Sequence, residues 1–435
     1  MEAGNVQITF GEAFRFWLKL GFISFGGPAG QIAIMHQELV DRRRWISERR
    51  FLHALNYCML LPGPEAQQLA TYIGWLMHRT WGGIVAGALF VLPSLVILIV
   101  LSWLYLAFGT VPAVAGLLYG IKPAIVAIVL AAAWRIGTRA LKHPALWTIS
   151  VAAFVALLFN VPFPAIVIVA GLIGAAGGRF APQVFAVTAH GKAQSAHGAA
   201  VIDDDTPTPA HARYRLGNVV WLLLVGVALW AVSLGFLVAV HGWSAMLTQI
   251  GWFFTKAALL TFGGAYAVLP YVYQAAVENY GWLTPVQMID GLALGETTPG
   301  PLIMVVAFVG FVAAWQGGVY DSLLLAGVIG ALVATFFTFL PSFIFILVGG
   351  PLVESTHGEL RFTAPLTGIT AAVVGVIVSL AVFFARHVFF ADGIDWLAIA
   401  AAAIALVSLV RYKVGLIPVI LVFGAAGMLH ALIAS

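Results

Sequence analysis

Long apolar runs alternate with short polar segments along most of the chain. In the first half they cover about 81–108, 112–134, 144–159 and 162–178, and in the second half about 320–348, 362–385, 396–410 and 415–433. Runs of this kind match the roughly 20 residues that a helix needs to cross a bilayer. The pattern predicts an all-α polytopic membrane protein with about ten to thirteen crossings.

Two interrupted helical stretches precede each set of runs. The first contains a Phe-Gly-Gly break and the second a Pro-Gly-Pro break. At a single offset of 237 residues the second half repeats Lys19, the Phe-Gly-Gly of residues 25–27, Trp45 and the Pro-Gly-Pro of residues 62–64. The motif Leu92-Pro93-Ser94 also recurs, eleven residues later than that offset requires. Several unrelated anchors at one offset indicate an internal duplication.

A change of composition separates the two copies. Residues 181–215 are rich in His, Asp and Pro and poor in large apolar side chains, which predicts a solvated polar linker. The segment 216–240 is apolar and has no partner in the first half. We therefore expect a first repeat at 1–180, the linker at 181–215, an extra connecting helix at 216–240 and a second repeat at 241–435.

Charge predicts the orientation of the copies. The loop 41–50 carries five arginines, whereas the matching stretch 278–287 has no Lys or Arg. By the positive-inside rule, loop 41–50 and the linker 181–215 are cytoplasmic and 278–287 is external. The sequence thus predicts two inverted-topology repeats. Each Pro-Gly-Pro stretch is expected to be a re-entrant hairpin, since a full crossing would move Arg135, Arg139 and Lys142 outside.

Composition excludes several classes of protein. Hydrophobic residues make up 62% of the 435 residues and charged residues 9%, against roughly 25% charged in a soluble domain. The formal charge of +4 gives no indication of nucleic-acid binding, because Lys and Arg lie mostly at the ends of apolar runs. The single cysteine, Cys58, excludes internal disulfides and cysteine-based metal clusters. No cofactor fingerprint is present, so we expect a protein that is not an enzyme.

Helix breaks at matching positions of two inverted halves are typical of the substrate sites of secondary transporters. Non-helical backbone is costly in lipid unless it is buried in protein or lines a wet cavity. A helix that restarts after a break also presents unpaired N–H groups that attract anions. The alternatives are tight helix packing for Phe-Gly-Gly and a simple turn for Pro-Gly-Pro. The predicted substrate-binding residues are Lys19, Ser24, Phe25, Gly26, Gly27, Pro62, Gly63, Pro64, Gln67, Lys256, Thr261, Gly263, Gly264, Thr298, Pro299 and Gly300.

Lys19 and Lys256 lie six residues before each Phe-Gly-Gly. A lysine within the hydrocarbon is expensive and indicates function, and two related by the repeat would match a divalent anion. The alternative is that both snorkel to an interface. Ser24 and Thr261 also match across the repeat. They are expected either to donate to an oxyanion or to bond their own helix backbone.

Two acids lie beside the Pro-Gly-Pro breaks, Glu65 and Glu296. A carboxylate removed from water takes up a proton more readily, which suits proton coupling. Capping of a helix N-terminus is an equally good interpretation for Glu65. His190, His197 and His211 in the linker fit no defined metal spacing, so no metal site is predicted.

The string FGGPAGQIAIMHQELVDRRRWISERRFLHALNYCMLLPGPEAQQLATYIGW at residues 25–75, with its degenerate second copy, resembles the chromate ion transporter family in its long two-domain form. The resemblance implies export of chromate across the bacterial inner membrane, chromate resistance, sulfate as a competing analogue, and coupling to protons or anion exchange. It also implies antiparallel repeats with about thirteen spans. The second copy has Ala265 where the first has Pro28, so equal roles for the halves are doubtful.

Two transport functions fit these observations, and an enzyme is the remote alternative to them. The first is a secondary active exporter of chromate that works by alternating access. The second is an oxyanion channel or passive anion exchanger, and the third is an intramembrane enzyme. Chromate and sulfate are both tetrahedral dianions, so only the resemblance favours chromate. A homodimer remains open, because the sequence does not report oligomeric state.

Overall fold

The computed structural model describes residues 8–185, 200–204, 206–207, 209–356, 363–391 and 393–434. Within these ranges the chain is helical, with a single isolated β-bridge between Ile46 and Ile202. The first half comprises α1 (Phe10–Ile23), α2 (Gly27–His36), the π-helix η1 (Gln37–Arg42), α3 (Glu48–Leu60), α4 (Glu65–Phe108), α5 (Pro112–Ala140), α6 (Pro144–Leu158), α7 (Phe163–Phe180) and α8 (Pro182–Phe185).

The second half repeats the order of the first. After the short η2 (Ala210–Ala212), α9 (Leu216–His241) covers the range predicted for the connecting helix. There follow α10 (Met246–Leu259), α11 (Ala265–Tyr273), the π-helix η3 (Gln274–Asn279), α12 (Pro285–Thr297), η4 (Leu302–Met304), α13 (Val305–Gln316), α14 (Leu323–Thr356), α15 (Thr363–Phe389), α16 (Trp396–Val410) and α17 (Leu416–Ala434). The matched π-helices are a further sign of duplication.

Seven helices in the described part of the chain are long and apolar enough to cross a membrane: α4, α5, α7, α9, α14, α15 and α17. Many large apolar side chains are exposed on them, such as Trp221 and Val232 on α9, as expected of helices that face lipid. The prediction of an all-α polytopic membrane protein is confirmed. Three further apolar helical segments, α6, η4–α13 and α16, are shorter than 18 residues, so the expected ten to thirteen crossings stay a prediction.

Helix α4 contains a reversal that joins two antiparallel segments. His78 and Arg79 have non-helical backbone angles, with φ values of −135° and 57°. A Cβ atom built on Gly74 would lie 2.5 Å from the Cβ of Ala86 and from the carbonyl oxygen of Gly82. Residues 65–77 therefore turn back along the long segment that follows them.

The Pro-Gly-Pro stretch of each half forms a hairpin along the long helix of the other half. In the first half, α3 begins beside the end of α14, where His53 Nε2 lies 3.3 Å from the Val353 carbonyl. The break at Gly63 reaches Ser342, and Tyr72 donates to Glu354 at 2.6 Å on the way back. The hairpin thus starts and finishes at the same end of α14.

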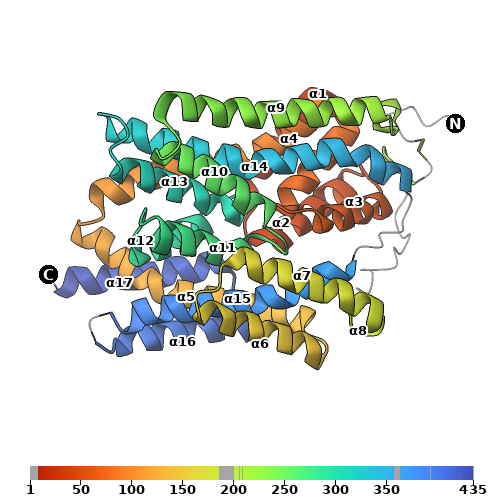
Figure 1. The fold of residues 1–435 in the computed structure, drawn as a ribbon. Helices are drawn as coiled ribbons and strands as arrows, with labels where there is room; N and C mark the ends of the chain where they lie inside the picture. The colour runs from red at the N-terminus through yellow and green to blue at the C-terminus, as the bar shows by residue number, and fades with distance from the viewer. Residues whose placement is uncertain are drawn as a thin grey trace.

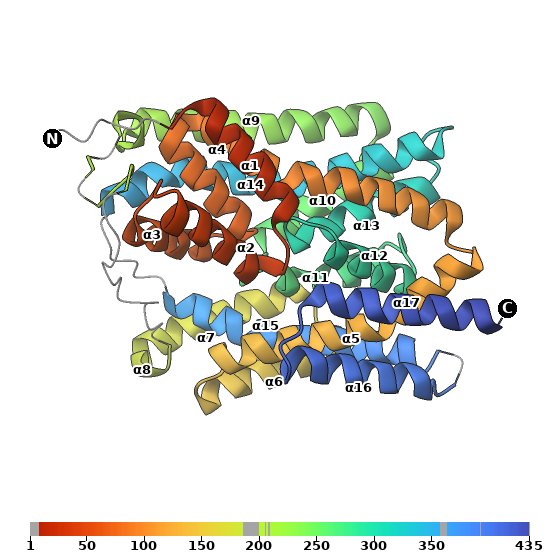
Figure 2. The ribbon, with the colours of Figure 1, turned by 180° about the vertical axis from the view of Figure 1, so that it is seen from behind.

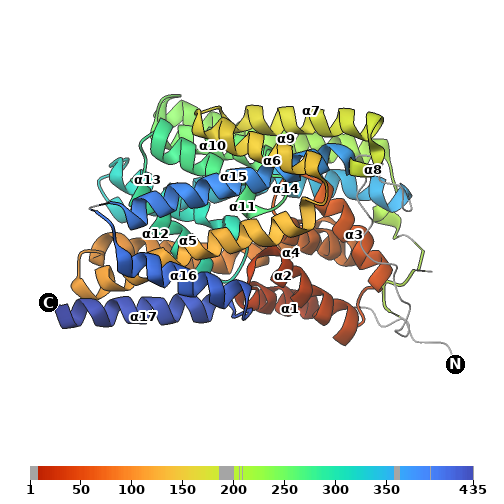
Figure 3. The same ribbon diagram turned by 90° about the horizontal axis from the view of Figure 1, so that it is seen from below.

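The second hairpin follows α4 in the same manner. Tyr105 near the end of α4 contacts both Asp290 of α12 and Phe308 of α13, and the break between them reaches Ser94. The remaining helices also pack on the opposite half. Helices α16 and α17 of the second half pack on α5 of the first, and α6 and α7 of the first half pack on α15 of the second. Figures 1 to 3 show this arrangement, with α1–α3 toward one end and α12 and α13 toward the other. The opposite orientation of the halves in a membrane stays a prediction.

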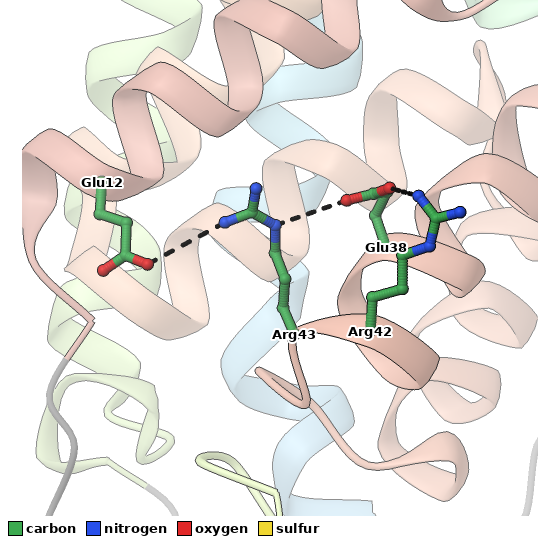
Figure 4. A network of polar contacts seen from close by, with 4 residues as sticks. All are labelled: Glu12, Glu38, Arg42 and Arg43. Carbon is green, nitrogen blue, oxygen red and sulfur yellow. Dashed lines mark hydrogen bonds and ion pairs between the residues drawn. The ribbon is translucent and has the colours of Figure 1, made fainter.

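Arg43 anchors the arginine-rich loop at the end where α1 begins (Figure 4). Its guanidinium lies 3.5 Å from Glu38, 4.0 Å from Glu12 and 5.0 Å from the ring centroids of both Phe16 and Trp45. At the matching place in the second half, the ring of Tyr280 stacks on Trp282 at 4.4 Å. A cation in one half thus occupies the place of an aromatic ring in the other.

This correspondence predicts the behaviour of two Arg43 variants. We expect Arg43→Ala to lower stability by about 1–3 kcal/mol, because it removes both the ring contacts and the ion pairs. Arg43→Tyr is expected to restore more than half of that loss, since Tyr280 fills the equivalent place between rings. Thermal unfolding in detergent measures both. Equal losses in the two variants would contradict the correspondence.

The described part of the linker clips onto the same loop. Ser47 donates to Asp204 at 2.6 Å, Arg50 donates to the Thr206 carbonyl at 2.6 Å, and the bridge between Ile46 and Ile202 lies beside them. Loop 41–50 and the linker therefore lie at one end of the molecule, as expected of segments on the same side of a membrane.

Candidate substrate site

The four helix breaks meet in the interior and are joined by two reciprocal backbone hydrogen bonds. The N–H of Gly63 donates to the Thr261 carbonyl at 2.7 Å, and the N–H of Gly300 donates to the Ser24 carbonyl at 2.7 Å. Each bond links the Pro-Gly-Pro of one half to the end of the helix before Phe-Gly-Gly in the other. Because an offset of 237 residues converts one bond into the other, we call this meeting point the crossing.

Four helical segments begin at the crossing. They are α2 at Gly27, α4 at Glu65, α11 at Ala265 and the η4–α13 segment at Leu302. A helix N-terminus carries unpaired N–H groups and roughly half a positive charge. Four such ends near one point add partial positive charge there, beside the side chains of Glu65 and Glu296.

The Phe-Gly-Gly motifs leave open space beside their backbone. Gly26, Gly27, Gly263 and Gly264 all have φ between 71° and 92°, where a residue with a Cβ is strained. A Cβ on Gly27 would meet nothing within 4 Å, and one on Gly264 would meet only Pro28 at 3.9 Å. Gly26 and Gly263 are exposed. The interpretation of these glycines as tight packing contacts is therefore wrong.

The Pro-Gly-Pro glycines are packed instead. A Cβ on Gly63 would lie 2.3 Å from the Ser342 hydroxyl, and a Cβ on Gly300 would lie 2.9 Å from the Cβ of Ser94. Pro64 and Pro299 are buried as well, and Pro62 is half-buried. Both serines belong to the repeated Leu-Pro-Ser motif, and this recurrence is the sequence signal that singles them out. These glycines hold the crossing together, whereas the Gly-Gly pairs line the space beside it.

Buried glutamines cap carbonyls that the breaks release. Gln31 donates to the carbonyl oxygens of Gly300 and Ser24, and Gln68 donates to the Pro62 carbonyl at 2.8 Å. Gln67, predicted from the sequence, donates to Thr71 at 3.0 Å. The amide oxygens of all three glutamines are buried without a partner within the described residues. Gln31 had no signal in the sequence, because it lies on a helix of mixed pattern.

The predicted hydroxyl donors bond their own helices. Ser24 donates to the Leu20 carbonyl and Thr261 to the Ala257 carbonyl, both at 2.7 Å. Thr298 donates to the Gly295 carbonyl at 2.9 Å. Of the two interpretations of Ser24 and Thr261, the structure therefore favours the structural one, and the backbone N–H groups are left as the donors at the crossing.

The two lysines do not come together at the crossing. Lys19 is exposed on the outer face of α1, while its neighbours Trp17 and Leu20 are buried. Lys256 is half-buried, with its Nζ atom 5.6 Å from the centroid of the Trp252 ring. The helical register places Lys19 opposite the packed face, so this side chain stays outside the site. Phe25 is half-buried at the break itself.

The two predicted acids lie in different settings. Glu65 is half-buried at the first turn of α4, directly after Pro64. Glu296 is 7% exposed and accepts a short hydrogen bond from the hydroxyl of Tyr266 on α11. This hydrogen bond joins α11 to α12 beside the crossing. Tyr266 was missed in the sequence because a tyrosine in an apolar run has no distinguishing pattern.

We expect Tyr266→Phe to destabilise the protein by about 1–3 kcal/mol, because the Glu296 carboxyl loses a buried donor. The double variant Tyr266→Phe with Glu296→Leu is expected to recover most of that loss, since no unpaired polar group remains. Thermal unfolding of the three proteins is the measurement. A double variant as unstable as the single one would show that the bond has no such role.

No group of three or more metal-ligating side chains occurs among the described residues. His211 lies 3.0 Å from the Trp75 carbonyl through Nε2. His190 and His197 lie outside the described residues.

Comparison with known proteins assigns the chain to a family. The family model described as "Chromate transporter" matches residues 11–175 and 248–428. A "Chromate transport protein" of Pseudomonas aeruginosa is 33% identical over 434 residues, which cover 98% of this chain and 94% of the relative. A "Chromate transport protein" of Cupriavidus metallidurans is 29% identical over 391 residues, covering 88% and 86%. No solved structure matches. These names indicate a transporter rather than an enzyme, and the chain belongs to the chromate transporter family.

Proposed function

We propose that the protein exports chromate from the cytoplasm by secondary active transport, coupled to protons or to anion exchange. The observation that carries the proposal is the crossing, where four helical segments begin and open space adjoins the Gly-Gly backbone before α2 and α11. Backbone N–H groups and helix dipoles favour a compact anion with several acceptor oxygens. Tetrahedral dianions have this character, and family membership favours chromate among them.

The site in this proposal consists of the four breaks, with Gln31 and Gln68 donating to the carbonyls that the breaks release and Gln67 donating to Thr71. The half-buried Lys256 is kept in the proposed site, whereas the exposed Lys19 is left out of it. Glu65 and Glu296 remain the candidates for proton coupling near the breaks. Sulfate has the same shape and charge as chromate, so it is expected to compete.

Alternating access would come from a movement of the two Pro-Gly-Pro hairpins relative to the bundle that α5–α7 and α15–α17 form together. The reciprocal contacts of the halves support inverted repeats, because each half supplies the hairpin that packs on the long helix of the other. We place loop 41–50 and the linker 181–215 in the cytoplasm of a bacterial cell, with the helices in the inner membrane.

Cysteine labelling tests this orientation. Cys58 is buried, so Arg49→Cys and Asn279→Cys, both at exposed positions, can be labelled in its presence. In intact cells, an impermeant maleimide is expected to label Asn279→Cys and to leave Arg49→Cys unlabelled until the membrane is opened. Labelling of both positions from one side would contradict the inverted repeats.

Flux in proteoliposomes tests the function. The purified protein is expected to move chromate, to be inhibited by sulfate, and to accumulate chromate against its gradient when a pH gradient or a counter-anion is supplied. Flux that only follows the chromate gradient under every condition would identify a channel or a passive exchanger instead.

A further inference from the structure

A buried ion pair lies apart from the crossing. The Nζ atom of Lys122 on α5 is 3.6 Å from Oδ1 of Asp290 on α12, and the hydroxyl of Tyr105 on α4 donates to Oδ2 of Asp290 at 3.0 Å. The Asp290 side chain is 3% exposed and that of Lys122 is 23% exposed. The sequence marks each residue as unusual within an apolar segment but gives no sign that they meet.

The pair lies between the crossing and one end of the molecule. Asp290 precedes the end of α12 at Thr297 by seven residues, or roughly 10 Å of helix. Tyr105 is three residues before the end of α4 at Phe108, on the side away from loop 41–50. An anion that leaves the crossing toward this end therefore passes the level of Lys122.

The pair has no counterpart at the matching positions of the first half. At the offset of 237 residues, the position of Asp290 is occupied by His53 in the first half, and His53 contacts the Val353 carbonyl. Val353 in turn occupies the place of Tyr105, because the extra eleven residues shift the offset to 248. The matching place in the first half thus holds a histidine beside a backbone carbonyl and no carboxylate. A charge pair that is costly in a membrane and absent from the matching place points to function.

We propose that Lys122 is a second binding group for the transported dianion and that Asp290 is its exchangeable counter-charge. The inference rests on the proposed function. In the empty protein the ammonium pairs with the carboxylate. A dianion at this level competes for the ammonium, and the released carboxylate takes one proton from water while Tyr105 keeps it in place. When the dianion departs, Asp290 gives the proton back and the ion pair forms again.

Among the described residues, Lys122 and Tyr105 are the charged and polar side chains that contact the Asp290 carboxylate. Of the helices that pack on α12, α4 supplies Tyr105 and α5 supplies Lys122 and, toward Glu296, Arg135, while η4 and α13 bring no titratable side chain. On α15, Arg386 and His387 lie in the last turn, and His387 Nδ1 is 3.0 Å from the Phe383 carbonyl. On α17, His430 stacks on Tyr119. Glu296 on α12 itself bonds Tyr266.

The test compares Asp290→Asn, Lys122→Gln and the double variant with the wild type in proteoliposomes. Asp290→Asn is expected to keep chromate–sulfate exchange at equal pH within about threefold, because no net proton movement is needed there. Its accumulation of chromate under a pH gradient should fall at least tenfold. Lys122→Gln should raise the KM for chromate at least tenfold, and the double variant should show both defects while unfolding at the wild-type temperature.

The matched control is Lys19→Gln, which removes an exposed lysine outside the site and should leave both activities unchanged. A double variant that exchanges and accumulates chromate like the wild type would show that the pair is structural, and would overturn the inference. So would Asp290→Asn with undiminished accumulation. If the wild type itself moves neither chromate nor sulfate, the proposed function fails as well, and the two failures are thereby distinguished.

Discussion

Replacing Gly63 by alanine is expected to prevent the protein from folding correctly and to abolish transport. The new Cβ would lie 2.3 Å from the Ser342 hydroxyl and 2.7 Å from Gln68 Nε2, at a φ of 126° that alanine rarely adopts. Overpacking costs about 1–3 kcal/mol and the left-handed backbone about 1–2 kcal/mol more. The reciprocal bond from Gly63 to Thr261 would be lost with the displaced backbone.

The yield of monodisperse protein and its thermal unfolding measure this effect. Gly300→Ala should behave in the same way, since Ser94 takes the place of Ser342. Gly235→Ala on α9 is the matched control. Its Cβ would meet nothing within 4 Å and its backbone is helical, so it should be neutral or more stable by about 0.5–1 kcal/mol. Normal folding of both Gly63→Ala and Gly300→Ala would refute the role of the crossing.

Replacing Gly27 by alanine, in contrast, is expected to leave the protein folded and to impair transport. The Cβ would enter open space, so the cost is limited to about 1–2 kcal/mol for the backbone. That methyl group would occupy the space through which an oxyanion approaches the N–H groups. Hydrogen bonds to charged groups contribute about 1.5–3 kcal/mol each, so transport should fall about tenfold or more for each one lost.

Chromate flux and the KM for chromate, measured with thermal unfolding, separate these effects. Gly264→Ala is expected to impair transport as well, at a higher backbone cost, because a φ of 92° with a ψ of 174° is confined almost entirely to glycine. Gly11→Ala on α1 serves as the control, because it also meets nothing within 4 Å but lies more than three turns before the crossing. A wild-type KM in both Gly27→Ala and Gly264→Ala would exclude the Gly-Gly backbone from the site.

The interruptions of the helices could be predicted from the sequence because glycine and proline act locally. Pro-Gly-Pro cannot continue a helix in any context, and its recurrence at one offset showed that the break belongs to both halves. The hairpin at Pro-Gly-Pro followed from the charges of Arg135, Arg139 and Lys142, which are also read directly from the sequence.

The partners across the crossing could not be predicted in this way. The N–H of Gly63 donates to the Thr261 carbonyl because of the way the two halves of the chain pack, and no local pattern encodes this pairing. The reversal at His78 and Arg79 lies just before the predicted apolar run at 81–108, where the expected hairpin ends, although its backbone angles have no sequence signal. Lys19 shows the same difficulty. Its spacing of six residues before the break does not determine which face of α1 carries the side chain.

Anomalous scattering from chromium tests the central claim most directly. Diffraction data from crystals grown with chromate, collected at the chromium absorption edge, locate the bound dianion without reference to the proposed site. The account predicts a peak at the crossing, within hydrogen-bonding distance of the backbone beside Gly26–Gly27 or Gly263–Gly264. Chromate bound only on the outer surface near Lys19, with no peak at the crossing, would contradict it.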